Sequence, residues 1–225
     1  MSVQSTVSQT EYFIELENQY GAHNYHPLPV VLKEGKGVFV WDVDNKKYYD
    51  FLSAYSAVNQ GHCHPKIIQT LIEQAQKLTL TSRAFHSEQL ALFSRFITEY
   101  FGYDKVLPMN TGAEAVETAL KLCRHWAYRV KKIAENKAKI IVCSGNFHGR
   151  TLGIISFSTD PDARKDFGPY LTGFETIPYN DLPALAEALR DNNVAGFLVE
   201  PIQGEAGVNV PDDGYLPKAK QYCAD

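Results

Sequence analysis

The fold of this chain is decided by residues 106–120, which read VLPMNTGAEAVETAL. The short apolar run predicts a strand near Val106, and the Asn-Thr-Gly that follows it starts a helical repeat at Gly112. A helix that begins there leaves several backbone N–H groups unpaired at the positive end of its dipole, which suits a phosphate. The segment therefore predicts a site for a phosphorylated ligand, with an ordinary N-cap and turn as the alternative.

The bulk composition is that of a globular chain. Its 225 residues, 44% of them hydrophobic, suffice for one large α/β domain or one and a half ordinary ones. The net charge of −4 and the scattered Lys and Arg residues argue against nucleic-acid binding. No apolar run approaches the roughly 20 residues that span a bilayer, so no membrane partner is predicted.

The N-terminal charge pattern and the cysteines indicate a cytoplasmic protein. Residues 1–32 contain no Lys or Arg, unlike a basic signal or transit peptide. The four cysteines lack C-x-x-C spacing, so we predict reduced thiols rather than disulfides. His62-Cys63-His64 has the residue types of a metal site, but adjacent side chains diverge and no second cluster completes four ligands. No metal is predicted.

Alternating strands and helices predict the fold class. A helix over 9–20 and β-rich runs at 38–41 and 47–51 open the chain, and helices begin near 65 and after 87. From residue 105 onward apolar strands alternate with helices, which predicts an α/β fold with a mostly parallel sheet flanked by helices. The architecture changes near residue 60. The elements predicted for the later part are strands near 106, at 140–143 and at 194–199, and helices from 112, at 182–190 and at 215–225.

The last predicted helix has Pro217 in its first turn and reaches Asp225 without a C-cap or a following strand. A crossover helix in a parallel sheet leads to another strand. We therefore expect the sequence to break off within a structural unit.

A loop after the predicted strand 140–143 carries candidate binding residues. Residues 144–151 read SGNFHGRT and follow a buried strand, where α/β proteins place their ligand-binding loops. Phe147 could stack on a planar ring, and Arg150 could pair with a carboxylate. The alternative is a Gly-bounded loop with a core Phe and a surface Arg.

Two carboxylates follow the predicted strand 194–199. Glu200 is costly to bury without a partner, so we expect a cation or a hydrogen-bond donor beside it. The alternative is a Glu satisfied by backbone donors of the turn. Glu205 lies five residues later. Glycosidases also use paired carboxylates, but the number of carboxylates is the only feature here that supports that chemistry. No serine-hydrolase elbow, P-loop or dinucleotide fingerprint is present in the sequence.

Taken together, three segments resemble the ordered landmarks of the class III pyridoxal-phosphate aminotransferases. They are NTGAEA at 110–115, GNFHGRT at 145–151 and VEPIQGE at 199–205. GAHNYHPLP at 21–29 and DFLSAYSAVNQGH at 50–62 resemble in particular the members that act on ornithine. The resemblance covers nearly the whole chain and implies fold type I of the pyridoxal-phosphate enzymes, apparently truncated. It assigns residues 1–60 to the small domain and 61–225 to the N-terminal part of the large cofactor domain.

The resemblance also implies residues for the cofactor, pyridoxal 5′-phosphate. Gly112 and Ala113 would donate backbone N–H groups to its phosphate, and Phe147 would stack on its pyridine ring. Glu200 would belong to the hydrogen-bonded surroundings of that ring. The lysine that bonds the cofactor and the aspartate that protonates the ring nitrogen have no match in this chain. We therefore expect no catalytic residue within it, and no turnover by residues 1–225 alone.

Four further residues are implied for the substrates, an amino acid and a 2-oxo acid. Tyr25, Tyr55 and Arg150 would shape the site, with Arg150 holding a carboxylate, and Glu205 would act as an acidic gate. The implied reaction moves the δ-amino group of ornithine to a 2-oxo acid, giving glutamate 5-semialdehyde and an amino acid. Transamination of acetylornithine or 4-aminobutyrate, and a non-catalytic truncated relative, are the alternatives. A homodimer is implied by the resemblance alone.

Overall fold

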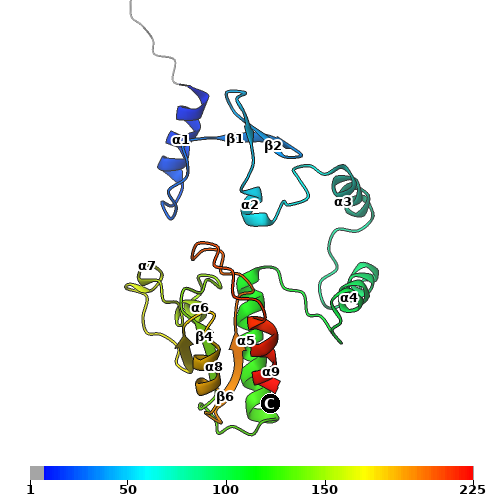
Figure 1. Cartoon of the computed structure of the whole chain (residues 1–225). Helices are drawn as coiled ribbons and strands as arrows, with labels where there is room; N and C mark the ends of the chain where they lie inside the picture. Colours follow the sequence, from blue (N-terminus) through cyan, green and yellow to red (C-terminus); the bar gives the residue numbers. More distant parts are fainter. Residues whose placement is uncertain (1–7, 225) are drawn as a thin grey trace, which may run out of the picture. The chain divides into compact units, whose positions relative to one another are not determined.

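The computed structural model describes residues 8–224 and divides into two compact units, 1–96 and 97–225, which are considered separately. Figure 1 labels their helices and strands. The predicted boundary near residue 60 falls inside the first of these units, and the assignment of small and large domains stays a prediction. Within the described residues, no helix combines the length and apolarity needed to cross a membrane.

The first unit opens with the predicted N-terminal helix. Helix α1 spans Gln9–Tyr20, as predicted, because Ser8 and Glu11 form a reciprocal capping box and Gly21 ends it. The two predicted β-rich runs form strands β2 (Phe39–Asp42) and β3 (Lys47–Tyr49), which pair antiparallel.

A third strand, β1 (Leu32–Lys36), completes the ribbon and was not predicted. Its sequence, LKEGK, carries no alternating apolar pattern, and no side chain in it is buried. The turn between β2 and β3 is closed by Asp42, whose carboxylate accepts hydrogen bonds from the N–H groups of Asp44 and Lys46 and from the Tyr48 hydroxyl.

Three helices follow the ribbon. Element α2 (Ser53–Ser56) is a single turn whose residues have positive φ, and the predicted helices α3 (Pro65–Lys77) and α4 (Glu88–Phe101) are confirmed. Pro65 suits the first position of α3 because its missing N–H would have had no partner there. No side chain of α3 or α4 is buried, although both helices are amphipathic. Helix α4 crosses the boundary between the units.

The second unit confirms the predicted α/β fold. Strands β4 (Lys139–Cys143), β5 (Phe174–Ile177) and β6 (Val194–Leu198) form a parallel sheet in the order β5-β4-β6. Figure 1 shows helices packed around these strands. The helices of the unit are α5 (Gly112–Arg129), α6 (Leu152–Ile155), α7 (Pro161–Arg164), α8 (Leu182–Ala188) and α9 (Tyr215–Ala224).

The core of this unit has two halves, one on each face of the sheet. Ile141 points to a cluster built with α8 and α9, whereas Ile140 and Val142 point to a cluster built with α5 and α6. This alternation is the two-residue period of a strand, and it requires β4 to be apolar on both faces. The central strand therefore holds both helical layers in place.

One predicted strand is wrong. Residues 103–110 form no strand, and the chain around Val106 pairs with none of the strands in the described part of the structure. An apolar run becomes a strand only when a neighbour takes up its backbone hydrogen bonds, and none does so here. The prediction for Asp225 at the end of the last helix lies outside the described residues.

Candidate functional site

The N-terminus of α5 presents unused hydrogen-bond donors. Thr111 caps the helix by accepting from the N–H of Glu114 at 3.1 Å, and the Glu114 carboxylate accepts in return from the N–H groups of Asn110 and Thr111. Among the described residues, the N–H groups of Gly112 and Ala113 have no acceptor. They lie at the positive end of an 18-residue helix dipole, which favours an anion.

The conformation of the loop after β4 is fixed by the buried side-chain amide of Asn146. This amide donates to the carbonyl oxygens of Cys143 at 2.6 Å and Phe157 at 3.1 Å. Asn146 is only 7% exposed. Gly145, with φ of +71°, makes the sharp exit from the strand. The loop leaves Phe147 44% exposed, so the alternative of a core phenylalanine is wrong. An exposed aromatic face can contact a planar ligand.

This loop lies directly against the first turn of α5. A Cβ placed on Gly149 would sit 3.1 Å from Ala113 Cβ and 3.0 Å from Ile154 Cδ1, so the loop packs closely on α5 at a residue without a side chain. The hydroxyl of Thr151, which caps α6, also donates to the carboxylate of Glu117 on α5. The structure thus brings the segments of Phe147 and Arg150 beside the turn of Gly112 and Ala113.

The turn after β6 contacts the loop after β4. Glu200 accepts a hydrogen bond from the N–H of Phe147 at 3.2 Å, so the predicted hydrogen-bond donor lies beside it; this donor comes from the loop after β4. Gln203, 3% exposed, donates from Nε2 to the Ser144 carbonyl at 2.8 Å. Because β4 and β6 are adjacent parallel strands, both loops leave the same edge of the sheet.

Burial shifts the pKa values of two side chains at this edge. Partial burial raises the pKa of Glu200, the Phe147 N–H opposes that shift, and the charge of Glu205 adds to it. Burial lowers the pKa of His148, whose ring packs on Phe157 with centroids 5.9 Å apart. Within the described residues, His148 Nε2 is buried without a hydrogen-bond partner. Burial therefore favours the neutral form of this imidazole.

The remaining predicted residues are dispersed. Arg150 and Glu205 are exposed at the edge just described, whereas Tyr25 and Tyr55 belong to the first unit, with 55% and 74% of their surfaces exposed. A common site of the tyrosines with Arg150 stays a prediction. The sequence did not indicate that Gln203 and Asn146 hold the two loops in place, although both residues lie inside the motifs quoted above. Their burial is the signal that the sequence alone does not carry.

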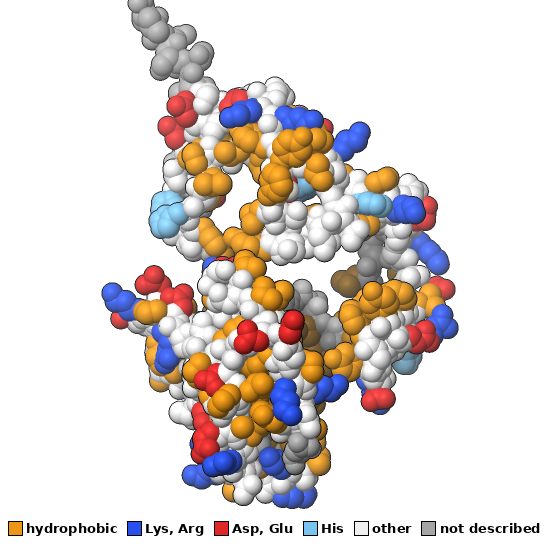
Figure 2. Space-filling model, viewed as in Figure 1, with side chains coloured by type: hydrophobic (Ala, Val, Ile, Leu, Met, Phe, Trp, Pro, Cys, Tyr) orange, Lys and Arg blue, Asp and Glu red, His pale blue; other side chains and the backbone are white. Residues whose placement is uncertain are grey.

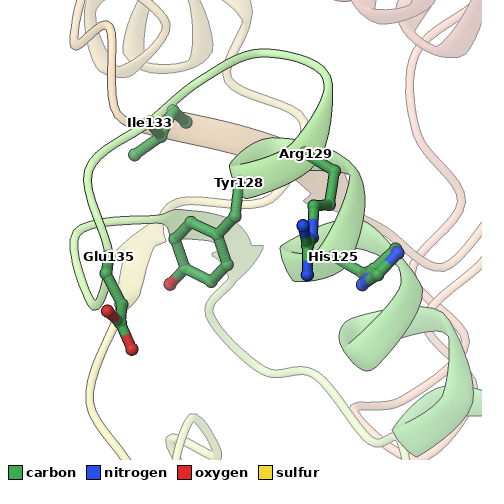
Figure 3. A pocket seen from close by; sticks show the side chains of 5 residues that line it. All are labelled: His125, Tyr128, Arg129, Ile133 and Glu135. Atoms are coloured by element: carbon green, nitrogen blue, oxygen red, sulfur yellow. The ribbon is translucent and has the colours of Figure 1, made fainter.

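A hollow in the surface of the second unit lies elsewhere. His125, Tyr128, Arg129, Ile133 and Glu135 line it at the C-terminal end of α5 (Figure 3), and Gly112 is at the other end of that helix. None of the predicted site residues contributes to it. Among the described residues, no three His, Cys, Asp or Glu side chains are grouped so as to hold a metal ion.

Known proteins match this chain along nearly its whole length. The sequence profile of the family described as aminotransferase class-III matches residues 20–225. The mitochondrial ornithine aminotransferase of Rattus norvegicus is 62% identical over 214 residues, which are 95% of this chain and 49% of that protein.

Two solved structures are similar as well. An ornithine aminotransferase of Toxoplasma gondii, with partial occupancy of PLP at its active site, has a TM-score of 0.95 and 52% identity, over 97% of this chain and 51% of that one. The acetylornithine aminotransferase of Elizabethkingia anophelis has a TM-score of 0.83 and 64% identity, over 96% and 52%. The chain spans about half the length of the relatives it matches.

Proposed function

Because the chain belongs to the class-III aminotransferase family, we propose that it forms part of a pyridoxal-phosphate-dependent enzyme that transfers the δ-amino group of ornithine to a 2-oxo acid. The products are glutamate 5-semialdehyde and an amino acid. One observation carries the proposal: the unused N–H groups of Gly112 and Ala113 lie in a turn that packs against the loop bearing the exposed ring of Phe147.

The residues at this edge fit the cofactor. Gly112 and Ala113 would donate to its phosphate, and a Cβ added at Gly112 would meet nothing within 4 Å, so the approach to the helix end is open. Phe147 would cover one face of the ring, and its N–H holds Glu200 beside it. When bound, pyridoxal phosphate supplies a conjugated ring that withdraws electrons from the amino-bearing carbon.

The charged residues at the same edge suit the substrates. Arg150 would bind a substrate carboxylate through its planar guanidinium. Glu205 would repel the carboxylates of the oxo acid and attract the δ-ammonium group of ornithine, which is the action of a gate between the two half-reactions. Tyr25 and Tyr55 would contact the amino donor, as the resemblance to the family implies. The family's cofactor-bonding lysine has no counterpart among these residues.

Acetylornithine is the alternative amino donor. The Elizabethkingia anophelis relative named for it is 64% identical to this chain, against 62% for the rat ornithine aminotransferase, so overall identity does not separate the two substrates. The ratio of kcat/KM for ornithine to kcat/KM for N-acetylornithine, measured on the full-length protein, decides between them. The non-catalytic alternative predicts no turnover of either substrate, or of 4-aminobutyrate.

The location and the assembly stay predictions. The rat relative is described as mitochondrial, so a cytoplasmic location is not a shared property of these proteins. Cell fractionation of the full-length protein tests the location, and sedimentation tests the proposed homodimer.

Binding of pyridoxal phosphate to this chain tests the site directly. We expect reversible binding in equilibrium dialysis, with inorganic phosphate as a competitor. Phe147→Ala should weaken it by about tenfold, since a stacked ring contributes roughly 0.5–1.5 kcal/mol beyond its buried area. Phe167→Ala is the matched control, because Phe167 is a similarly exposed aromatic residue of the second unit. Equal affinities of the two variants would contradict the proposed site.

A test of the helix end uses two glycines. Gly112→Ala should leave stability nearly unchanged, because its Cβ has open space. Gly149→Ala should destabilise the fold by about 1–3 kcal/mol, because φ at Gly149 is +128° and the added Cβ lies close to Ala113 and Ile154. Urea unfolding measures both. A Gly149→Ala variant as stable as Gly112→Ala would contradict both the strained backbone at Gly149 and its close packing on α5.

A further inference from the structure

The segment that carries Tyr55 has an unusual backbone. Ser53, Ala54, Tyr55 and Ser56 are consecutive residues with φ of +49°, +48°, +56° and +70°. A left-handed conformation costs roughly 1–2 kcal/mol for each residue that has a Cβ, and none of the four is Gly, Asn or Asp. A run of this kind persists only where its surroundings hold it, and such strain gathers at functional sites.

One carboxylate closes the start of this left-handed turn. Asp50 Oδ1 accepts hydrogen bonds from the N–H groups of Leu52 and Ser53, both at 2.9 Å. Its other oxygen, Oδ2, lies 2.6 Å from His62 Nε2. The Asp50 side chain is 16% exposed and that of His62 is 27% exposed, so the pair is partly shielded from water. These hydrogen bonds hold the pKa of Asp50 below its usual range, and the bond from the Ser53 N–H has the largest effect.

The β-ribbon in turn holds His62. The N–H of Gly37 donates to the His62 carbonyl and the His62 N–H donates to the Gly37 carbonyl, each at 2.9 Å. A Cβ added at Gly35 would lie 2.7 Å from His62 Cγ, so the imidazole packs directly on the backbone of β1. A chain of contacts therefore runs from the ribbon through His62 and Asp50 to the turn.

We propose that Asp50 and His62 are positioning residues that hold Ser53–Ser56 left-handed and thereby fix where Tyr55 meets the amino donor. This rests on the proposed function only through the role of Tyr55. Without the Asp50 carboxylate, the N–H groups of Leu52 and Ser53 lose their acceptor, and the four residues relax toward negative φ. Tyr55 then moves, and discrimination between amino donors falls.

Steady-state kinetics of the full-length protein test the consequence. Asp50→Ala should raise the KM for ornithine by about tenfold and lower the preference for ornithine over 4-aminobutyrate, with a smaller change in kcat. Asp50→Asn retains Oδ1 as an acceptor and should recover most of the loss. Gly35→Ala should reproduce the effect by displacing His62, whereas Lys36→Ala, an exposed neighbour on the same strand, should not.

A second readout does not depend on turnover. With 3-fluorotyrosine in the protein, the ¹⁹F resonance of Tyr55 is identified by its loss in Tyr55→Phe. We expect Asp50→Ala and Gly35→Ala to shift this resonance and Lys36→Ala to leave it in place. Unchanged resonances in both variants would overturn the proposal, as would an unchanged preference for ornithine. A shifted resonance in a protein that does not use ornithine would support the positioning role and reject the proposed substrate.

Discussion

Single buried polar side chains determine where the loops of the candidate site lie. Gln203 ties the turn after β6 to the loop after β4, and Asn146 ties that loop to its own strand end. Each amide satisfies a carbonyl oxygen that would otherwise be left without a partner, at a cost of roughly 1–3 kcal/mol. Charged side chains act differently, because their contribution to stability changes with pH.

Asp191 and Lys139 give a pH-dependent contribution. Asp191 Oδ2 lies 2.8 Å from Lys139 Nζ, and this contact is the largest cause of both a lowered pKa of Asp191 and a raised pKa of Lys139. The Asp191 contribution is present above the unfolded pKa of about 3.9 and is lost as the pH falls through the lower folded value. The Lys139 contribution is present below about pH 10.4 and is lost as the pH rises through the higher folded value.

Asp191→Asn should therefore lower the free energy of unfolding at neutral pH. The difference between the variant and the natural chain should become smaller in acid and in strong base. Urea unfolding at a series of pH values measures this difference. The side chains are 31% and 42% exposed, so added salt should shrink the effect. Glu175→Gln is the control, because Glu175 lies 3.5 Å from the same lysine and should contribute less. A pH-independent difference would contradict the assignment.

At the scale of the element, the capping box of α5 determines which N–H groups of its first turn are satisfied. It satisfies the N–H of Glu114, whereas those of Gly112 and Ala113 have no acceptor among the described residues. The cap also sets the start of the helix at Gly112, and the first turn packs against the loop of Gly149. Helix α6 begins in a similar way, with Thr151 accepting from the N–H of Ile154.

Thr111→Ala should destabilise the second unit by about 1 kcal/mol, because it removes the hydroxyl that accepts from Glu114. Thr111→Ser keeps that oxygen and serves as the matched control. Urea or thermal unfolding compares the two variants. If alanine and serine proved equally stabilising at this position, the capping box would not be a source of stability.

At the scale of the molecule, apolar surface remains on both units, as Figure 2 shows. Ile67, Ile68, Leu71 and Ile72 recur at helical spacing on α3, and between 38% and 62% of each residue is exposed. The outer strands β5 and β6 of the parallel sheet each lack a second neighbour among the described strands. Apolar faces and open strand edges both favour association.

The 225-residue chain should therefore self-associate or bind a hydrophobic dye at micromolar concentration. Leu71→Glu should reduce both, since it places a charge in the middle of the apolar stripe of α3. Gln69→Glu, an exposed polar position on the same helix, is the control. Sedimentation and dye fluorescence are the measurements. A monodisperse, monomeric chain that binds no dye would show that this stripe is covered.

Much of the architecture was predictable because its causes are local. The bounds of α1 follow from Ser8, Glu11 and Gly21, and the start of α5 follows from Thr111 and Glu114, all within one helical turn of the ends they determine. The apolar run of β4 likewise predicted a strand buried on both faces. The motifs near residues 147 and 200 were each predicted to follow an apolar strand, and they follow β4 and β6, which are parallel neighbours.

The rest depended on partners distant in sequence. Residues near Val106 have the composition of a strand, yet they form none without a neighbour to pair with. The polar strand β1 forms because β2 supplies that neighbour. The left-handed turn at Tyr55 is stabilised by His62, which the ribbon holds, and no local propensity indicates it. Side-chain period and helix caps are properties of neighbouring residues, whereas pairing, burial and backbone strain are decided only when the folded chain brings remote groups together.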